Sequence, residues 1–168
     1  MNAARFFLEP GKNLDQPFIL HNVDVISNID LGAMVARHAE RNALATLAVQ
    51  ERKSSRLLVF NDEDQLCGRR IAILSKDVPS SGHELEEMAA SHHCAGEHAL
   101  AFSGIHVISS QIFSKMPETG AFSIIDAYLK LAASGEKIVA FRADDCYWRD
   151  LGRPESLSAA ENDVARGI

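Results

Sequence analysis

The sequence predicts an α/β domain with a mixed, mainly parallel sheet flanked by helices. A near-continuous apolar strand at residues 17–25 precedes an amphipathic helix and a second apolar strand at residues 44–49. Strands of this kind belong in sheets that are covered on both faces. Strand, helix and strand in this order favour a right-handed crossover between parallel strands. The C-terminal half continues the alternation of strands and helices, and no internal repeat is visible.

Length and composition narrow the class of protein. The chain has 168 residues, of which 46% are hydrophobic and 24% are charged, and these shares are close to globular averages. They argue against disordered, collagen-like and disulfide-scaffold proteins. The formal net charge of −6 makes general nucleic-acid binding a poor candidate, since that needs clustered Lys and Arg. No apolar run approaches the length of a membrane span, so we expect no membrane partner.

Cysteine usage and the N-terminus indicate a location. The three cysteines, Cys67, Cys94 and Cys146, are odd in number and far apart. They suit a reduced cytoplasm better than a disulfide framework. The first residues contain neither a long apolar stretch nor a small-residue cleavage site, so we see no signal peptide. We therefore expect a cytoplasmic protein.

The helix after the first strand has recognisable ends. Asn28 or Asp30 can accept hydrogen bonds from its first turn, and Asn42 ends it. Its apolar residues recur at helical spacing: Leu31, Met34, Val35, His38 and Ala39.

A hairpin is expected next, with strands at residues 57–61 and 66–74 joined by an acidic turn. Residues 75–97 are the least predictable stretch and contain a short helical piece near 84–91. The histidines and the cysteine of residues 83–98 match no zinc-finger spacing, so incidental histidines in a loop are favoured over a metal site.

The remaining elements follow from periodicity and from capping residues. We expect a strand at 98–109, a short helix at 109–116, a helix capped by Ser123 and ended by Gly135, a strand at 136–143, an extended piece within 146–152, and a last helix opened by Pro154.

Asp24 is the first candidate site residue. It stands at the carboxyl end of a buried strand, and in open α/β sheets ligands bind in the crevice beyond those ends. A carboxylate meets a phosphate only through a cation. Mg²⁺ is the natural bridge, held by one or two carboxylates and by substrate oxygens. The alternative is that Asp24 is a solvated residue in a turn, and its place in the sequence, taken alone, favours this alternative.

A second candidate is the stretch W-R-D-L-G-R-P-E at residues 148–155. It can form a rigid turn that aims Asp150 into a crevice while Trp148 packs beneath. Equally, the sole tryptophan is a core residue and Asp150 is an acid that favours the helix dipole. Arg149 and Arg153 suit phosphate contacts or a charged surface, and both interpretations stay open.

Together these stretches resemble the sugar-1-phosphate nucleotidyltransferase family. HNVDVISNIDL resembles the segment where a strand ends in an N-x-D or G-D acid, and AFSGIHVIS is similar to the sugar-contacting strand, with Gly104 at the family's glycine. The stretch from MPETGAFSII to YWRDLGRPESLSAAE resembles the closing W-x-D-x-G-x-P-E segment. The resemblance covers about residues 17–165 and is nearest to guanylyltransferases that act on mannose- or heptose-type 1-phosphates and to related uridylyltransferases.

The resemblance implies a partial Rossmann-like nucleotidyltransferase fold and a reaction. A sugar 1-phosphate attacks the α-phosphorus of a nucleoside triphosphate, with Mg²⁺ as cofactor, and pyrophosphate leaves. Asp24 and Asp150 would be the catalytic, metal-holding acids, while Asn22, Gly104 and Trp148 would bind substrate. Catalysis would rest on positioning and charge neutralisation, without a covalent protein intermediate.

The sequence departs from the family in two places. The family begins with a Gly-rich loop of the G-x-G-T-R-L kind, whereas the only early glycine here is Gly11. The family's E-K-P segment, whose lysine meets the sugar phosphate, has no clear counterpart between Leu66 and Gly82, and Lys76 is a weak stand-in.

These departures lead to an expectation about assembly. We expect a single nucleotidyltransferase-like domain at residues 1–168, truncated on its N-terminal side. Its strand at 18–23 would lack its usual neighbour, and exposed apolar strands associate. A homo-oligomer or a complementing chain is therefore predicted. The alternative function is a non-catalytic module for sugar-phosphate binding or assembly.

Overall fold

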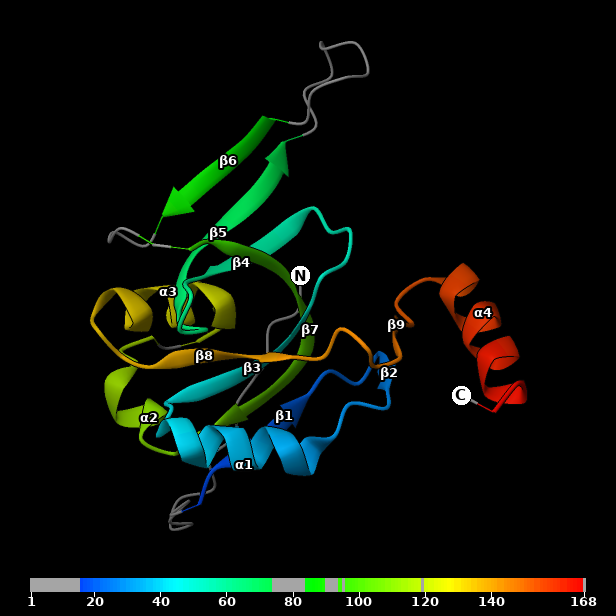
Figure 1. Cartoon of the computed structure of the whole chain (residues 1–168), viewed down its shortest axis with the longest axis horizontal. Coiled ribbons are helices and arrows are strands. Elements are labelled where there is room, and N and C mark those ends of the chain that lie inside the picture. Colours follow the sequence, from blue (N-terminus) through cyan, green and yellow to red (C-terminus); the bar gives the residue numbers. More distant parts are fainter. Residues whose placement is uncertain (1–15, 74–83, 90–93, 95, 119, 168) are drawn as a thin grey trace.

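The structure is a computed structural model of the chain, and it describes residues 16–73, 84–89, 94, 96–118 and 120–167 (Figure 1). The elements are, in chain order, β1 (Phe18–His21), β2 (Val25–Ser27), α1 (Leu31–Arg41), β3 (Ala45–Gln50), β4 (Arg56–Phe60), β5 (Leu66–Ile73), β6 (Glu84–Ala89), β7 (His98–Ile108), α2 (Ile112–Lys115), α3 (Ile124–Ala133), β8 (Ile138–Arg142), β9 (Trp148–Asp150) and α4 (Pro154–Ala165).

The main sheet is mixed, as predicted, but it is mostly antiparallel. Its seven strands have the order β6-β5-β4-β7-β3-β8, and β1 also pairs with β7. The pair of β3 with β8 is parallel, while the other pairs of this sheet are antiparallel. The prediction of a mainly parallel sheet is therefore wrong. β1 and β3 do run parallel, as the crossover rule requires, but β7 lies between them and is antiparallel to both.

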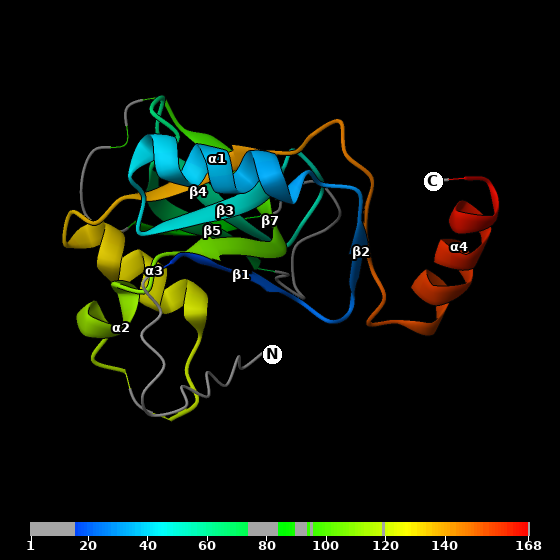
Figure 2. The same cartoon turned by 90° about the horizontal axis from the view of Figure 1, so that it is seen from below.

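Helices cover both faces of this sheet. In Figure 2, α1 lies on one side of the sheet and α2 and α3 lie on the other. Because side chains alternate along a strand, Leu47 and Val49 of β3 join the cluster that contains Tyr128 of α3. Ala48, which points the other way, joins the cluster that contains Met34 of α1. The α/β layering predicted from the sequence is confirmed.

The ends of α1 follow the predicted chemistry. Asp30 is the N-cap, and its carboxylate accepts a hydrogen bond from the Ala33 N–H at 2.9 Å. Asn28, the other candidate, instead accepts the N–H of Tyr147 at 2.7 Å. Asn42 ends the helix in the left-handed region, with φ of +46°. Of the two capping candidates, Asn28 is thus used to connect distant segments.

The predicted elements of the C-terminal half are confirmed. The Ser123 hydroxyl accepts a hydrogen bond from the Asp126 N–H at the start of α3, and Gly135 follows the helix with φ of +89°. Pro154 occupies the first turn of α4. None of the helices in the described ranges is long and apolar enough to cross a membrane.

The hairpin of β4 and β5 is confirmed, but the helical piece near residues 84–91 is wrong. Residues Glu84–Ala89 form β6, which pairs antiparallel with β5. Pairing with a neighbouring strand overrides the helical preference of a Glu-rich segment. Lys76, His83, His92 and His93 lie outside the described residues.

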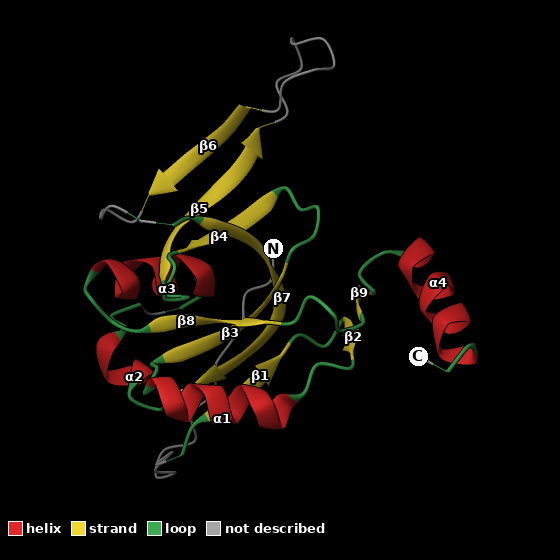
Figure 3. Ribbon diagram, in the orientation of Figure 1, coloured by secondary structure: helices red, strands yellow, loops and turns green. Residues whose placement is uncertain are grey.

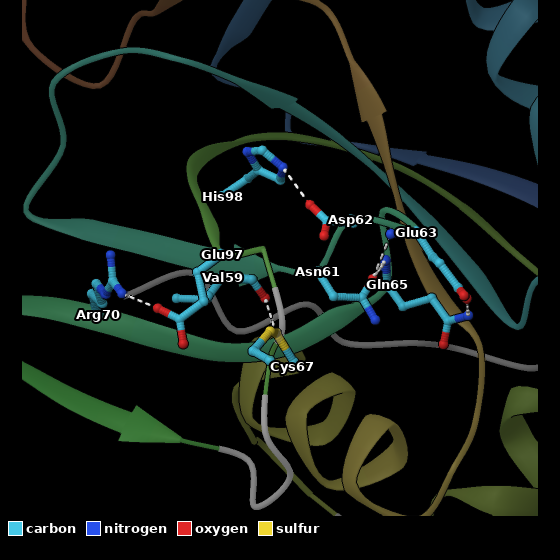
Figure 4. The surroundings of a disulfide bond; sticks show 10 residues. Val59, Asn61, Asp62, Glu63, Gln65, Cys67, Arg70, Glu97 and His98 are labelled. Atoms are coloured by element: carbon cyan, nitrogen blue, oxygen red, sulfur yellow. Dashed lines mark hydrogen bonds and ion pairs between the residues drawn. A yellow bond between two sulfur atoms is a disulfide. The ribbon is translucent and has the colours of Figure 1, made fainter.

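The cysteine spacing predicted no disulfide, and this prediction is also wrong. Cys67 and Cys94 form a disulfide with their Cα atoms 6.1 Å apart (Figure 4). β4 pairs with both β5 and β7, so the segment before β7 is brought close to β5. The Cys67 Sγ also lies 3.3 Å from the Val59 carbonyl oxygen. Cys146 is a free thiol.

Candidate functional site

Two short strands carry the candidate acids. β2 and β9 form a two-stranded ribbon at the edge of the main sheet (Figure 3), in which Val25 is opposite Asp150. The Leu151 N–H donates to the Asp24 carbonyl oxygen at 2.7 Å. Because Asp24 directly precedes Val25, the ribbon brings two acids from distant parts of the chain to the same place.

The two carboxylates face a common space beside Gly152. If Gly152 carried a Cβ atom, that atom would be 2.9 Å from Asp150 Oδ1 and 3.6 Å from Asp24 Oδ2. The Gly152 N–H donates to Asp150 Oδ1 at 2.7 Å, which fixes that carboxylate. Asp24 is half-buried and Asp150 is exposed. A glycine at 152 therefore keeps the space between the two acids open.

The donor set fits Mg²⁺. This ion prefers oxygen ligands and binds through one or two carboxylates, keeping its other positions for water and substrate phosphates. Asp24 and Asp150 supply two such carboxylates around one open position. In the part of the chain that the structure describes, no group of three or more His, Cys, Asp and Glu side chains is arranged to hold a metal. A cation held by these two carboxylates would keep its other positions for water and substrate oxygens.

Asn22 and Gly104 lie together next to the acids. The Asn22 N–H donates to the Gly104 carbonyl oxygen at 2.9 Å, and the Val25 N–H donates to the Asn22 carbonyl oxygen at 3.3 Å. Gly104 is buried in β7 with φ of +76°, and a Cβ atom there would be 2.8 Å from Asn22 Nδ2. A glycine thus lets the Asn22 side chain lie directly against the strand.

Trp148 packs against the same part of β7. Its indole Nε1 donates to the Ser103 carbonyl oxygen at 2.7 Å, and the residue is half-buried. It contacts the smaller of the two core clusters from its margin. Trp148 is therefore packed, half-buried, against the margin of the core rather than enclosed in it.

Arg52 is a site residue that the sequence did not single out. Its guanidinium carbon lies 3.7 Å from the centroid of the Trp148 ring, and its Nη2 donates to the Phe102 carbonyl oxygen at 2.8 Å. Burial lowers the pKa of Arg52, and the charge of Asp150 acts in the opposite direction. A signal existed in the sequence: Arg52 follows the carboxyl end of buried β3, the same kind of position that singled out Asp24.

Other charged residues near the ribbon connect it to the scaffold. Arg149 forms an ion pair with Asp163 of α4 at 2.5 Å, and the Tyr147 hydroxyl donates to the same carboxylate. Hydrogen bonds from Tyr147 and Arg149 lower the pKa of Asp163. Asp144 accepts the N–H of Glu51 at 2.6 Å. These contacts favour a structural role for Arg149 over a phosphate contact, and they link Asp144 to the residue after β3.

Comparison with known proteins identifies the family of this chain. The sequence pattern of the family described as "Nucleotidyl transferase" matches residues 2–167. The chain belongs to this family. The resemblance deduced from three sequence motifs is therefore confirmed for the family as a whole.

One curated relative is a mannose-1-phosphate guanylyltransferase of Mycobacterium tuberculosis (strain ATCC 25618 / H37Rv). It is 24% identical over 161 residues, which are 94% of this chain and 40% of that protein. The chain thus spans less than half the length of this relative.

Two solved structures share the fold. One is a crystal structure described as a glucose-1-phosphate thymidylyltransferase from Bacillus anthracis in complex with a sucrose, with a TM-score of 0.54 and 21% identity over 92% of this chain and 56% of that chain. The other is the inositol-1-phosphate CTP transferase from T. maritima, with a TM-score of 0.56 and 14% identity over 88% and 54%. The mixed sheet with flanking helices is thus a nucleotidyltransferase architecture.

Proposed function

We propose that this chain carries out nucleotidyl transfer from a nucleoside triphosphate to a sugar 1-phosphate, giving a nucleotide sugar and pyrophosphate. The observation that supports this most directly is the pair of Asp24 and Asp150 on either side of the open position beside Gly152. Membership of the nucleotidyl transferase family gives that pair of acids its chemical context.

The reaction joins two anions, and its difficulty is electrostatic. An oxygen of the sugar phosphate forms a bond to the α-phosphorus, and the bond between that phosphorus and the pyrophosphate oxygen breaks. Mg²⁺ held by Asp24 and Asp150 would offset the negative charge that both substrates bring together. Positioning of the two substrates would supply the rest of the rate enhancement, so no serine, cysteine or histidine has to act as a nucleophile.

The sugar is proposed to lie against Asn22 and Gly104. The Asn22 amide and the backbone of β7 offer hydrogen-bonding groups beside the acids, and the Trp148 ring lies against the same strand. A mannose-type 1-phosphate with GTP is the first substrate pair to test, because the curated relative is named as a mannose-1-phosphate guanylyltransferase.

The decisive experiment measures Mg²⁺-dependent pyrophosphate release by Asp24→Asn and Asp150→Asn variants. Each substitution removes one carboxylate charge with little change of shape, so we expect activity to fall at least about a hundredfold. Asp145→Asn is the matched control, since Asp145 is an exposed acid just before the ribbon. Full activity in both site variants would reject the assignment.

A non-catalytic module that binds sugar phosphates is the second candidate. It is favoured by the absence of a G-x-G-T-R-L stretch from the sequence. A calorimetric titration separates the two candidates. Binding of GTP or UTP supports the enzyme, whereas binding of a sugar 1-phosphate without either nucleotide supports the module.

We also propose that β1 takes part in association with a second copy or a complementing chain. Among the described strands, β1 pairs with β7 alone, and Ile19 within it is 40% exposed. An exposed apolar edge of this kind favours pairing with another chain. Light scattering after size-exclusion chromatography tests the proposal, and a stable monomer would contradict it.

A further inference from the structure

We infer that Arg52 binds the phosphate group of the sugar 1-phosphate, next to Asp24 and Asp150. The inference rests on the proposed function, because it concerns the substrate of the same site. It assigns to a residue of the β3–β4 connection a contact with the anion that takes part in the reaction.

The guanidinium of Arg52 is held in place before any ligand arrives. The Arg52 N–H donates to the Gln50 carbonyl oxygen at 3.1 Å, which turns the chain directly after β3. The side chain then stacks on Trp148 at 3.7 Å and donates from Nη2 to the Phe102 carbonyl oxygen at 2.8 Å. A guanidinium that is already oriented loses little conformational freedom on binding an anion.

Most of the hydrogen-bonding capacity of this guanidinium is unused by the protein. Arginine has five N–H donors, and within the described residues Arg52 makes one side-chain hydrogen bond, to Phe102. Its Nε is buried with no hydrogen-bond partner among them. Arginine forks match phosphate oxygens in pairs, so the remaining Nη donors suit a phosphate group.

The local charge also fits a phosphate. In the described part of the chain, Arg52 forms no ion pair within 4.0 Å, although Asp150 is near enough to raise its pKa electrostatically. Two carboxylates and one guanidinium leave the site with one net negative charge, and a divalent cation would reverse that sign. A phosphate monoester, which is an anion at neutral pH, then meets attraction from both the cation and Arg52.

The position of Arg52 along β7 favours a contact with the phosphate of the sugar over a contact with the triphosphate. Arg52 is anchored on Phe102, which is two residues before Gly104 on the same strand. Trp148, on which the guanidinium stacks, donates to the carbonyl oxygen of Ser103, the residue directly before Gly104. A molecule whose sugar contacts Gly104 and Asn22 would therefore direct a phosphate on its first carbon toward Arg52 and the two acids.

Titration calorimetry with mannose 1-phosphate in the presence of Mg²⁺ tests the inference, with free mannose, inorganic phosphate and GTP as comparison probes. We expect Arg52→Gln to weaken mannose 1-phosphate binding at least about tenfold and to leave the binding of free mannose unchanged. Arg52→Lys restores charge without the paired donors and should recover part of the affinity. Lys53→Gln, at an exposed neighbour, is the matched control and should bind like the wild type.

A purely structural role for Arg52 would give a different pattern. Trp148 is the only tryptophan, so its fluorescence and near-ultraviolet circular dichroism report directly on the stack. If Arg52→Gln disturbs these signals and weakens mannose and mannose 1-phosphate equally, Arg52 supports Trp148 and the inference is wrong.

The remaining outcomes separate this inference from the proposed function. Unchanged affinity of Arg52→Gln for mannose 1-phosphate overturns the inference alone. A selective loss of GTP affinity instead would move Arg52 to the triphosphate and also overturn it. A wild-type protein that binds no sugar 1-phosphate, mannose or heptose type alike, would overturn both proposals.

Discussion

The main sheet and the β2–β9 ribbon are held together by different forces. All six residues of β3 are buried, and this strand lies between β7 and β8 with helices on both faces. The ribbon consists of two strands of three residues each, in which Val25 is the single buried residue. The sheet is therefore stabilised by apolar burial, to which the ribbon contributes little.

Specific polar contacts hold the ribbon instead. Asn28 and Tyr147 exchange hydrogen bonds between the segments that flank its two strands. The Gln50 amide, at the end of β3, donates to the carbonyl oxygens of Ala143 and Cys146 at 2.7 and 2.9 Å. Side chains of the site can therefore be changed with little loss of global stability, which makes functional variants interpretable.

The largest expected effect comes from truncating matched apolar side chains in the two regions. Leu47→Ala in β3, where the side chain is fully buried, should cost about 2–5 kcal/mol of unfolding free energy. Ile26→Ala in the ribbon, where the side chain is 36% exposed, should cost about 1 kcal/mol or less. Urea unfolding of both variants measures the difference. Equal losses would mean that the ribbon is part of the cooperative core.

The next effect concerns the disulfide that joins β5 to the segment before β7. Cys67→Ser should lower the unfolding free energy of the oxidised protein by about 2–4 kcal/mol, because the bond closes a loop between residues 27 positions apart. Cys146→Ser, at the free thiol, is the control and should change it by less than about 1 kcal/mol. Oxidation of the reduced, purified protein should therefore raise its stability. Three titratable thiols under oxidising conditions would contradict the bond.

Acid should destabilise the sheet through His106. Burial lowers the pKa of His106 to about 4, and its Nδ1 lies 2.6 Å from the Tyr128 hydroxyl. An unfolded histidine binds its proton near pH 6.5, so stability is full above that pH and falls as the pH drops toward 4. The total loss is roughly 3 kcal/mol at most.

Replacing His106 tests this origin of the acid sensitivity. Urea unfolding of His106→Gln should depend less on pH between 6.5 and 4 than that of the wild type. The slope should not vanish, since burial also lowers the pKa of His38. His21→Gln, at an exposed position, should keep the wild-type slope. A wild-type slope in His106→Gln would contradict the assignment.

The difference between the regions also explains which features the sequence could predict. Strong local patterns placed β3, β7, α1 and α3, and the capping roles of Asp30 and Ser123 followed from residue type. Strand direction could not be deduced in the same way. The insertion of β7 between β1 and β3 is a pairing between distant segments, and no local periodicity encodes it.

Site residues could be predicted only where the residue and its neighbours in sequence were a sufficient signal. Asp24 was selected by its place after a strand, and Asp150 by its turn of Trp, Gly and Pro residues, but their proximity depends on the β2–β9 register. Arg52 depends on contacts with Trp148 and Phe102. Those partners come from two other strands, so its role could not be deduced from its neighbours in sequence.

A small stability effect is expected at two glycines, Gly104 and Gly135, and the pair best separates structure from function. Gly104 and Gly135 both have a positive φ, +76° and +89°, so an alanine at either position should cost about 1 kcal/mol of backbone strain. Around Gly135 there is nothing within 4 Å of an added Cβ, whereas at Gly104 the Asn22 side chain is 2.8 Å away. The Asn22 amide can turn aside, but the Asn22 Cβ would still lie 3.2 Å away, so Gly104→Ala should lose somewhat more stability than Gly135→Ala.

Binding should nevertheless distinguish these two glycine variants. Displacement of Asn22 in Gly104→Ala should weaken the binding of mannose 1-phosphate at least about tenfold. Gly135→Ala, at the end of α3, should bind it like the wild type. Titration calorimetry measures the affinity of the two variants, and urea unfolding of the same proteins measures their stability. If both variants bind equally well, Asn22 is not held against β7 for the sugar, and the sugar subsite must be sought elsewhere along the ribbon.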